Sequence, residues 1–339
     1  MMTPEKRLFF QKQLLQLYNQ YQRALPWRAV DVKPNPYYVW LSEIMLQQTT
    51  VVTVIPYFNR FIKKWPTITH LAHATQDEVF HLWQGLGYYQ RARNLLKCAQ
   101  VIESTYQSVF PEDLSSLLSL PGIGPYTAAA IRTIAFNQPE TVVDGNIESV
   151  LSRYLCFDGV FPKAKKQFSG EISEIFQVAK PGDLAQSIMD LGSMICKPTS
   201  PSCTDCPIQQ KCCAFASKNT QNYPKKAPKT PKPTRYSSLF WIENNKSQVY
   251  IRKRTEGRLL LGLMEFPSTP WLESNQSPAD GDIKVMHTFT HFHLILEIIK
   301  TDAVPVWTQG GFWCDKNDLE NYAFPTVMRK VIRKISDQY

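Results

Sequence analysis

Residues Leu120 to Asn146 read LPGIGPYTAAAIRTIAFNQPETVVDGN, and this stretch decides how the N-terminal part of the chain folds. Residues 121–124, Pro-Gly-Ile-Gly, are too rich in glycine for a helix, whereas residues 126–131 form a small-residue run of high helix propensity. The pattern predicts a helix, a glycine hairpin and a second helix. Gly122 and Gly124 allow positive φ and leave backbone N–H groups open at the next helix, where a phosphate can bind. An ordinary connection between two helices is the alternative interpretation.

The far end of this stretch carries a carboxylate. Asp144 follows the apolar pair Val142-Val143 and precedes a helix expected at 147–155. Aspartate is a favoured N-cap residue, so a purely structural role is one interpretation. A capped carboxylate is also held in place for catalysis, so the two roles are compatible.

A second carboxylate, Glu43, lies in a stretch that we expect to be one helix from Tyr38 to about Thr53. Its neighbours three and four positions away are mostly apolar, so its side chain shares an apolar face. Partial burial raises the pKa of a carboxyl group, and a general acid at neutral pH requires a raised pKa. A structural glutamate bonded to an arginine or a loop amide is the alternative.

The composition indicates a soluble globular protein with an anionic partner. The chain has 339 residues, 43% hydrophobic and 20% charged, which predicts two domains of ordinary size. The net charge of +9 favours an anionic partner, although charge alone does not separate nucleic acid from an acidic membrane. The N-terminus lacks the apolar core of a signal peptide, and no apolar run reaches the length of a membrane span. We therefore expect a cytoplasmic protein that does not associate with membranes.

Five of the eight cysteines lie within eighteen residues, which suggests a metal site in a reducing compartment. The spacing C-x6-C-x2-C-x5-C lets four thiolates converge from one short loop, as in a [4Fe–4S] site. Structural zinc usually draws on two C-x-x-C knuckles, and only one is present, but zinc remains an alternative. Cys213 is expected to be a bystander, and because it adjoins Cys212, the identity of the fourth ligand stays open between them. The four candidate ligands are Cys196, Cys203, Cys206 and Cys212.

The character of the chain changes after the cysteines. Residues 218–235 are rich in lysine and proline and contain no acidic residue, which is typical of a stiff basic linker. Beyond it, residues 239–242 and 249–251 predict a β-hairpin, and residues 328–334 predict a basic amphipathic helix. The C-terminal part is therefore predicted to be a smaller domain of mixed α and β structure.

Three motifs now coincide: the hairpin with its downstream aspartate, the four-cysteine loop, and the helix LSEIMLQQT at 41–49. Together they resemble the helix–hairpin–helix DNA glycosylase superfamily, and most closely the adenine DNA glycosylases of the MutY type. The resemblance implies a mainly α catalytic domain at 1–217, with two helical modules, a hairpin at about 114–133 and an iron–sulfur loop at 196–212. It implies the linker at 218–235 and a smaller α+β Nudix-like domain at 236–339, where the likeness is weaker.

The resemblance also implies a reaction. Enzymes of this family remove adenine mispaired with 8-oxoguanine or guanine from double-stranded DNA in base excision repair. Glu43 matches the general acid that protonates the flipped adenine, and Asp144 matches the carboxylate that stabilises the sugar cation. Tyr126 and Asn146 match polar groups beside the sugar. The four cysteines match the [4Fe–4S] ligands, and a monomer is expected.

Tyr126 distinguishes this chain from the endonuclease III type, because glycosylases with lyase activity carry a lysine there. A tyrosine cannot form their Schiff base, so the enzyme is predicted to be monofunctional. Two alternatives stay open on the sequence: a glycosylase/lyase of oxidised pyrimidines, and a non-catalytic DNA-binding or redox-sensing iron–sulfur protein.

The remaining matches concern recognition of DNA. In the C-terminal domain, Phe289-Thr290-His291 resembles the 8-oxoguanine recognition loop, with threonine in place of the commoner serine. The stretch after Glu265 lacks the glutamate-rich helix of a catalytic Nudix box, so no pyrophosphatase activity is expected. Gln186 lies near where some relatives have a glutamate, in the adenine pocket. The other residues matched are Arg23 and Arg28 in that pocket, and Leu46, Gln48, Tyr88, Gly122 and Gly124 as DNA contacts.

Overall fold

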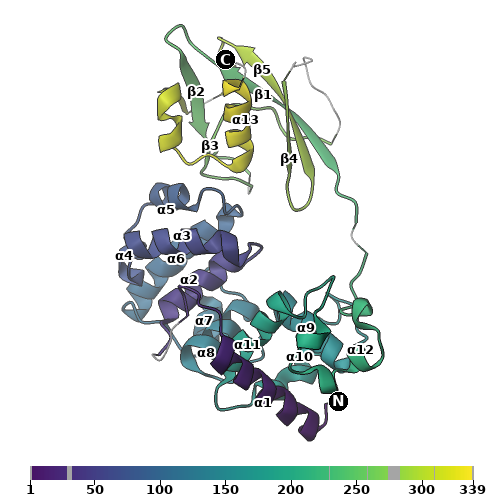
Figure 1. The fold of residues 1–339 in the computed structure, drawn as a ribbon. Coiled ribbons are helices and arrows are strands. Elements are labelled where there is room, and N and C mark those ends of the chain that lie inside the picture. The colour runs from purple at the N-terminus through teal and green to yellow at the C-terminus, as the bar shows by residue number, and fades with distance from the viewer. Residues whose placement is uncertain are drawn as a thin grey trace. The chain divides into compact units, whose positions relative to one another are not determined.

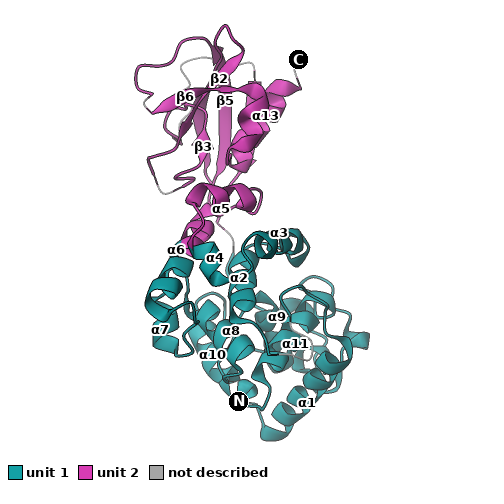
Figure 2. Cartoon of the chain, turned by 90° about the vertical axis from the view of Figure 1, so that its left-hand side faces the viewer, with its two compact units in different colours: residues 1–72, 97–228 teal, residues 73–96, 229–339 magenta. Residues whose placement is uncertain are grey.

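The computed structural model describes residues 2–28, 33–228, 230–257, 259–273, 283–308 and 310–337 (Figure 1). The chain divides into two compact units. Unit 1 comprises residues 1–72 and 97–228, and unit 2 comprises residues 73–96 and 229–339 (Figure 2). In this division residues 73–96 group with the C-terminal residues, whereas the sequence predicted one continuous domain over 1–217. That domain assignment stays a prediction.

Unit 1 is helical. Its helices are α1 (Pro4–Tyr21), α2 (Pro36–Leu46), α3 (Val51–Lys64), α4 (Ile68–Ala72), α7 (Leu114–Ser119), α8 (Pro125–Phe136), α9 (Gly145–Leu155), α10 (Lys165–Ile172), α11 (Pro181–Met194) and α12 (Cys213–Ala216), together with the later part of α6 (Tyr89–Tyr106). The predicted helix, hairpin and helix at 114–133 correspond to α7, a turn and α8. The family's fold is thus confirmed in this region.

The ends of these helices follow local chemistry. Proline is the first residue of α8, where its missing N–H costs no hydrogen bond. The helix ends at Asn137, whose φ of 55° is the left-handed conformation common at helix C-termini. Asp144 is the N-cap of α9, as predicted, and Cys156 ends that helix with a φ of 53°.

The stretch predicted as one helix from Tyr38 to about Thr53 is two helices, and that prediction is wrong. α2 ends at Leu46 and α3 begins at Val51. Between them Gln48 has a φ of 59°, which a right-handed helix cannot contain. The apolar periodicity continues across the break, so pattern alone did not reveal it. The break places Glu43 in the last turn of α2 and leaves a polar loop beside it.

α11 passes close to two other helices because it carries glycines at the contacts. A Cβ atom at Gly182 would lie 2.7 Å from the Thr133 carbonyl oxygen of α8. A Cβ atom at Gly192 would lie 2.7 Å from Cβ of Asn146 in α9. α8 in turn packs its buried small residues against α2. These close contacts bring α2, α8, α9 and α11 together.

Unit 2 contains the strands. Its elements are α5 (Gln76–Trp83), the start of α6, β1 (Thr234–Ile242), β2 (Gln248–Lys253), β3 (Met264–Glu265), β4 (Ile283–Thr288), β5 (His293–Thr301), β6 (Gly311–Asp315) and α13 (Thr326–Ser336). The strands form two three-stranded sheets, with the orders β1-β5-β4 and β3-β2-β6. The β1 and β5 strands are parallel and the other pairs are antiparallel.

The predicted hairpin of 239–242 with 249–251 is wrong in its pairing, although both strands exist. β1 pairs with β5, and β2 pairs with β3 and β6, so the two strands belong to different sheets. One isolated bridge, Glu243 to Val249, remains at the turn. The reason is the core: apolar residues of both sheets and of α13 share one buried cluster, which a flat hairpin would not enclose. The predicted C-terminal helix is confirmed as α13.

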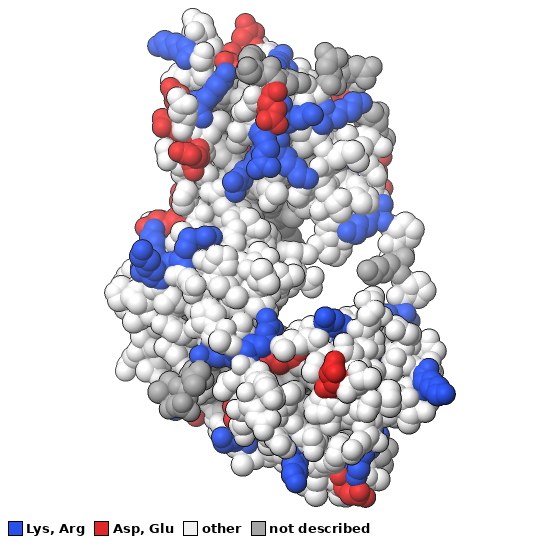
Figure 3. Space-filling view, in the orientation of Figure 1, with Lys and Arg blue, Asp and Glu red and all other residues white. Residues whose placement is uncertain are grey.

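Lysine and arginine cover more of the face seen in Figure 3 than aspartate and glutamate do. This agrees with the net charge of +9. Within the described ranges, no helix has the length and apolar character needed to span a membrane.

Candidate active site

A cavity of about 780 Å³ in unit 1 brings the predicted catalytic residues together. Its walls come from α2, the loop after it, α8, the start of α9 and α11. The predicted residues that line it are Glu43, Tyr126, Asp144, Asn146, Arg23, Arg28, Gln186, Leu46 and Gln48. The lining does not include Gly122, Gly124, Tyr88 or residues 289–291. Residues up to 163 positions apart in sequence, Arg23 and Gln186, therefore share one site.

Glu43 is the buried acid of this cavity. Its side chain is on the core face of α2 and only 7% of the residue is exposed. The hydroxyl of Tyr126 donates a hydrogen bond to its Oε2 over 2.8 Å. Burial raises the pKa of Glu43 to about 7, and the nearby charge of Asp144 raises it as well, against the opposing effects of Tyr126 and Arg28. Glu43 can therefore hold a proton near neutral pH.

Asp144 is held from two sides. Its Oδ1 accepts the backbone N–H of Ile147 at 2.7 Å, which caps α9, and its Oδ2 accepts Nδ2 of Asn146 at 2.9 Å. Burial raises the pKa of Asp144, while these hydrogen bonds and the charge of Lys165 oppose the rise. The capping role and a preorganised carboxylate thus coexist in one residue.

The cavity wall includes an ion pair that the sequence did not indicate. Arg28 binds Asp190 through two hydrogen bonds, Nη1 to Oδ2 at 2.6 Å and Nη2 to Oδ1 at 3.0 Å. Arg23 lies 3.9 Å from the same carboxylate. Asp190 is four residues after Gln186 in α11, so the two share one buried helical face. A carboxylate on that face is the feature of the sequence that could have indicated a buried ion pair. The Gln186 side chain donates to the Gly182 carbonyl within its own helix.

Lys165, at the start of α10, is a second lining residue that the sequence analysis missed. Its ammonium lies 3.7 Å from Oε1 of Glu148. Glu148 belongs to the first turn of α9, beside Asp144. Lys165 thus contributes positive charge near Asp144, and position 126 carries a tyrosine.

The glycine hairpin lies outside the cavity, and its backbone has the geometry expected for binding a phosphate group. Gly122 has a φ of 79° and Gly124 is the N-cap of α8 without a side-chain cap. A Cβ atom at Gly124 would meet no heavy atom within 4 Å, so there is open space beside the N-terminus of α8.

The four candidate cysteine ligands line one small cavity in unit 1, beside Arg153, Ile208 and Phe215. The guanidinium of Arg153 donates to Sγ of Cys196 over 3.3 Å. Burial raises the pKa of the Cys206 thiol to about 12, and the other three thiols add to the rise. Mutual proximity, apolar walls and an adjacent cation fit an anionic cluster with four thiolate ligands. Among the described residues, no group of three or more His, Cys, Asp or Glu side chains is arranged to hold a single metal ion.

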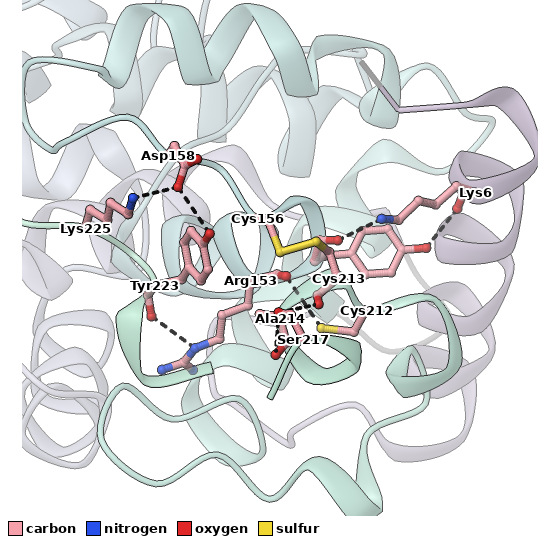
Figure 4. The surroundings of a disulfide bond; sticks show 11 residues. Lys6, Arg153, Cys156, Asp158, Cys212, Cys213, Ala214, Ser217, Tyr223 and Lys225 are labelled. Atoms are coloured by element: carbon pink, nitrogen blue, oxygen red, sulfur yellow. Dashed lines mark hydrogen bonds and ion pairs between the residues drawn. A yellow bond between two sulfur atoms is a disulfide. The ribbon is translucent and has the colours of Figure 1, made fainter. Parts of the chain in front are cut away.

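The fifth cysteine of this loop is not a bystander, and that expectation is wrong. Cys213 forms a disulfide with Cys156, which is 57 residues earlier in the chain (Figure 4). The bond joins the C-terminal end of α9 to α12, next to the candidate ligand Cys212. Cys212 donates its thiol hydrogen to the Arg153 carbonyl at 3.6 Å. Cysteine spacing gives no signal for a pair that is 57 residues apart in sequence.

The predicted recognition loop lies in unit 2, between β4 and β5. Thr290 and His291 are exposed, whereas Phe289 is partly buried. The N–H of Phe289 donates to the carbonyl of Phe292 at 2.9 Å and closes the loop. Tyr88, in the same unit, forms a hydrogen bond with the Thr290 hydroxyl.

Comparisons with known proteins agree with this fold. Residues 41–177 match the family described as HhH-GPD superfamily base excision DNA repair protein, and residues 238–334 match the NUDIX domain family. A solved thermostable thymine-DNA glycosylase covers 63% of this chain and 98% of its own, with a TM-score of 0.56 and 27% identity. A non-covalent endonuclease III–DNA complex shares the fold, with a TM-score of 0.52 and 21% identity, covering 64% and 99% of the chains.

The fold and the two-carboxylate cavity thus define a base excision repair glycosylase of the helix–hairpin–helix class, joined to a Nudix-like domain. Proteins that are similar over nearly the whole sequence identify the family within this class. An adenine DNA glycosylase of Buchnera aphidicola (subspecies Acyrthosiphon pisum) is 36% identical over 344 residues, covering 96% of this chain and 97% of the relative. The adenine DNA glycosylase of Homo sapiens is 32% identical, covering 97% and 74%. The chain belongs to the adenine DNA glycosylase family and is a hydrolase of the N-glycosidic bond.

Proposed function

We propose that this enzyme releases adenine mispaired with 8-oxoguanine or guanine in double-stranded DNA, acting as a monomer and without cleaving the strand. The observation that carries the proposal is the pairing of two carboxylates, the buried Glu43 and the half-buried Asp144, in one cavity of about 780 Å³. That volume suits a small-molecule-sized ligand such as an extruded nucleotide. Two carboxylates of different environment are the usual requirement for cleaving a glycosidic bond.

Glu43 acts as the general acid. Because its Oε2 accepts the Tyr126 hydroxyl, the transferable proton resides on Oε1. That proton moves to a ring nitrogen of adenine, so the base can leave with the electron pair of the broken C1′–N9 bond. A pKa of about 7 keeps a large fraction of Glu43 protonated at neutral pH.

Asp144 acts on the sugar. As the C1′–N9 bond breaks, positive charge develops on the sugar, and the ionised Asp144 stabilises it. The hydrogen bonds from Ile147 and Asn146 fix the carboxylate before substrate arrives, so little reorganisation is needed. Water then adds to C1′ and its proton goes to the ionised Glu43, which restores the general acid and leaves free adenine and an abasic site.

Strand cleavage requires an amine that attacks C1′, and position 126 carries a tyrosine in this chain. The Tyr126 hydroxyl is engaged with Glu43, and burial raises its pKa well above the usual value, so it stays protonated as a donor. Strand scission without alkaline treatment, or an adduct trapped with borohydride, would contradict the monofunctional assignment.

The direct test is a single-turnover assay on a duplex with one adenine opposite 8-oxoguanine. Glu43→Gln and Asp144→Asn should each lower the rate by about 10²- to 10⁴-fold while duplex binding is retained. The amide oxygen of Glu43→Gln can still accept the Tyr126 hydroxyl. The amide oxygen of Asp144→Asn can still accept the Ile147 N–H, whereas its amide nitrogen cannot accept from Asn146. Glu112→Gln, at an exposed position of the same unit, is the matched control. Near-normal turnover by either variant would remove that residue from the mechanism.

We also propose that Cys196, Cys203, Cys206 and Cys212 hold a [4Fe–4S] cluster. It would supply structural support to the loop before α12, and it takes no part in the hydrolysis described above. The support for this is the common cavity of the four thiols and the adjacent Arg153. Four irons per chain with a visible absorption band are expected. One zinc per chain and no visible band would contradict the proposal.

In unit 2, the loop of Phe289, Thr290 and His291 is proposed to read the base opposite adenine. The support is exposure: Thr290 and His291 are both exposed in the β4–β5 connection, and the Thr290 hydroxyl is hydrogen-bonded to Tyr88. Thr290→Ala should therefore reduce the preference for 8-oxoguanine over guanine opposite adenine. An unchanged preference would refute this role.

A further inference from the structure

A continuous set of contacts leads from a buried carboxylate in unit 2 to the proposed reading loop. The carboxylate belongs to Glu265 in β3, and 2% of that residue is exposed. Arg252 and Arg254 both bind it, with Nε of Arg252 at 3.0 Å from Oε1 and Nη1 of Arg254 at 2.6 Å from Oε2. A buried carboxylate with charge-assisted bonds to both oxygens is fixed in position, and it fixes its partners.

Arg254 also contacts an aromatic ring. Its guanidinium lies 5.0 Å from the centroid of Trp271, and its Nε donates to the Leu259 carbonyl at 3.1 Å. The backbone next to Trp271 is also fixed, because Leu272 and Tyr236 of β1 exchange two hydrogen bonds of 2.7 and 3.1 Å. Trp271 is therefore held both through its ring and through its main chain.

Trp271 in turn packs on the loop. Its ring is stacked on Phe289 with centroids 5.6 Å apart and an interplanar angle of 30°. Phe289 is stacked on Phe292 at 4.8 Å, and the edge of His287 meets its ring at 4.6 Å. The Phe289 carbonyl accepts Nζ of Lys232 at 3.0 Å. Phe289 is thus packed on several sides, while the next residue, Thr290, is exposed.

We propose that Trp271, held between Arg254 and Phe289, is a positioning residue that fixes the reading loop for the base opposite adenine. Glu265 affects the loop indirectly, because it orients Arg254. The inference rests on the proposed reading role of the loop. Its physical basis is entropy: a four-residue loop that is ordered before binding does not lose that freedom when it meets the damaged base.

The indole nitrogen of Trp271 supports a role in packing rather than in polar contacts. It is buried and has no hydrogen-bond partner among the described residues. A buried indole N–H usually finds a partner, so this half-buried residue keeps its large ring despite an unmet donor. The ring contacts with Arg254 and Phe289 are what the residue provides.

The test compares single-turnover rates on two duplexes, with adenine opposite 8-oxoguanine and adenine opposite guanine. Trp271→Leu should lower the ratio of the two rates by about three- to tenfold, the size of one lost aromatic stacking pair. Trp271→Phe keeps a ring and should largely keep the ratio. Arg254→Met, which leaves Glu265 bonded to Arg252, should lower the ratio in the same direction. The melting temperature of each variant separates loss of folding from loss of reading.

Trp313→Leu is the matched control, because Trp313 lies in the sheet β3-β2-β6, away from the loop. Its ring centroid is 5.4 Å from that of Tyr250. It should leave the ratio unchanged. The inference is overturned if Trp271→Leu keeps the wild-type ratio while Thr290→Ala lowers it. It is also overturned if Trp271→Leu and Trp313→Leu lower the ratio equally. If Thr290→Ala keeps the ratio, the proposed reading role itself fails, and the inference falls with it.

Discussion

Replacing Glu43 with glutamine should make the enzyme more stable at alkaline pH while it removes catalysis. The wild-type carboxyl is buried beside Asp144, and its pKa is raised to about 7 from the ordinary 4.5. Ionising it inside the protein therefore costs free energy that the unfolded chain does not pay. Glutamine fills the same space, does not titrate, and can still accept the Tyr126 hydroxyl.

The magnitude follows from the two pKa values. Between pH 4.5 and about 7 the folded protein binds the Glu43 proton more tightly than the unfolded chain, so wild-type stability falls as pH rises through this window. At about 1.4 kcal/mol per pH unit, the loss is about 3 kcal/mol and is complete above the folded pKa. For a unit of roughly 200 residues, this corresponds to about 6–12 °C in melting temperature.

The assay is thermal denaturation of wild type and Glu43→Gln from pH 5 to pH 9, without DNA. The two proteins should be close in stability at pH 5, and the variant should be ahead by several degrees at pH 8.5. Glu112→Gln, at an exposed site, should show no such divergence. A difference between Glu43→Gln and wild type that does not change with pH would refute the buried, raised-pKa carboxyl.

Three further predictions concern the two sites. The single-turnover rate should fall above about pH 7 as Glu43 ionises and should fall in acid as Asp144 takes a proton, which a rate profile from pH 4.5 to 9 will show. Arg153→Met should reduce the cluster absorbance and lower the stability by about 3 kcal/mol or more. The reason is that the buried guanidinium donates hydrogen bonds to five backbone carbonyls, those of Cys196, Lys197, Pro198, Thr220 and Tyr223. A variant with the same absorbance and melting temperature as wild type would contradict this prediction. Alkylation of the oxidised protein should leave Cys156 and Cys213 unlabelled until a thiol reductant is added, and mass spectrometry that finds both labelled beforehand would exclude the disulfide.

The local features of the site could be predicted because they depend on neighbours in sequence. The hairpin follows from glycine density at 121–124, and the N-cap at Asp144 follows from the residue type before a helical run. The burial of Glu43 follows from its apolar face in α2. Each of these is determined within one or two helical turns, so periodicity and propensity are sufficient.

The errors lie where local signals are ambiguous. The break at Gln48 was missed because apolar spacing continues from α2 into α3. The hairpin at 239–251 was mispaired because two strands joined by a tight turn usually pair, and here the strands separate into different sheets to enclose a shared core. In both cases packing overrode the preference of the short segment.

The sequence by itself determined which candidate groups the protein carries: two carboxylates, one of them on an apolar helix face, a tyrosine at position 126, four cysteines at cluster spacing and a glycine hairpin. Only the tertiary structure decided which groups meet. The bond from Tyr126 to Glu43 spans 83 positions, and the Arg28–Asp190 pair spans 162. Cys156 and Cys213 meet across 57 positions. Such contacts depend on how helices pack, with Gly182 and Gly192 permitting close approach, and no pattern within a single segment encodes that packing.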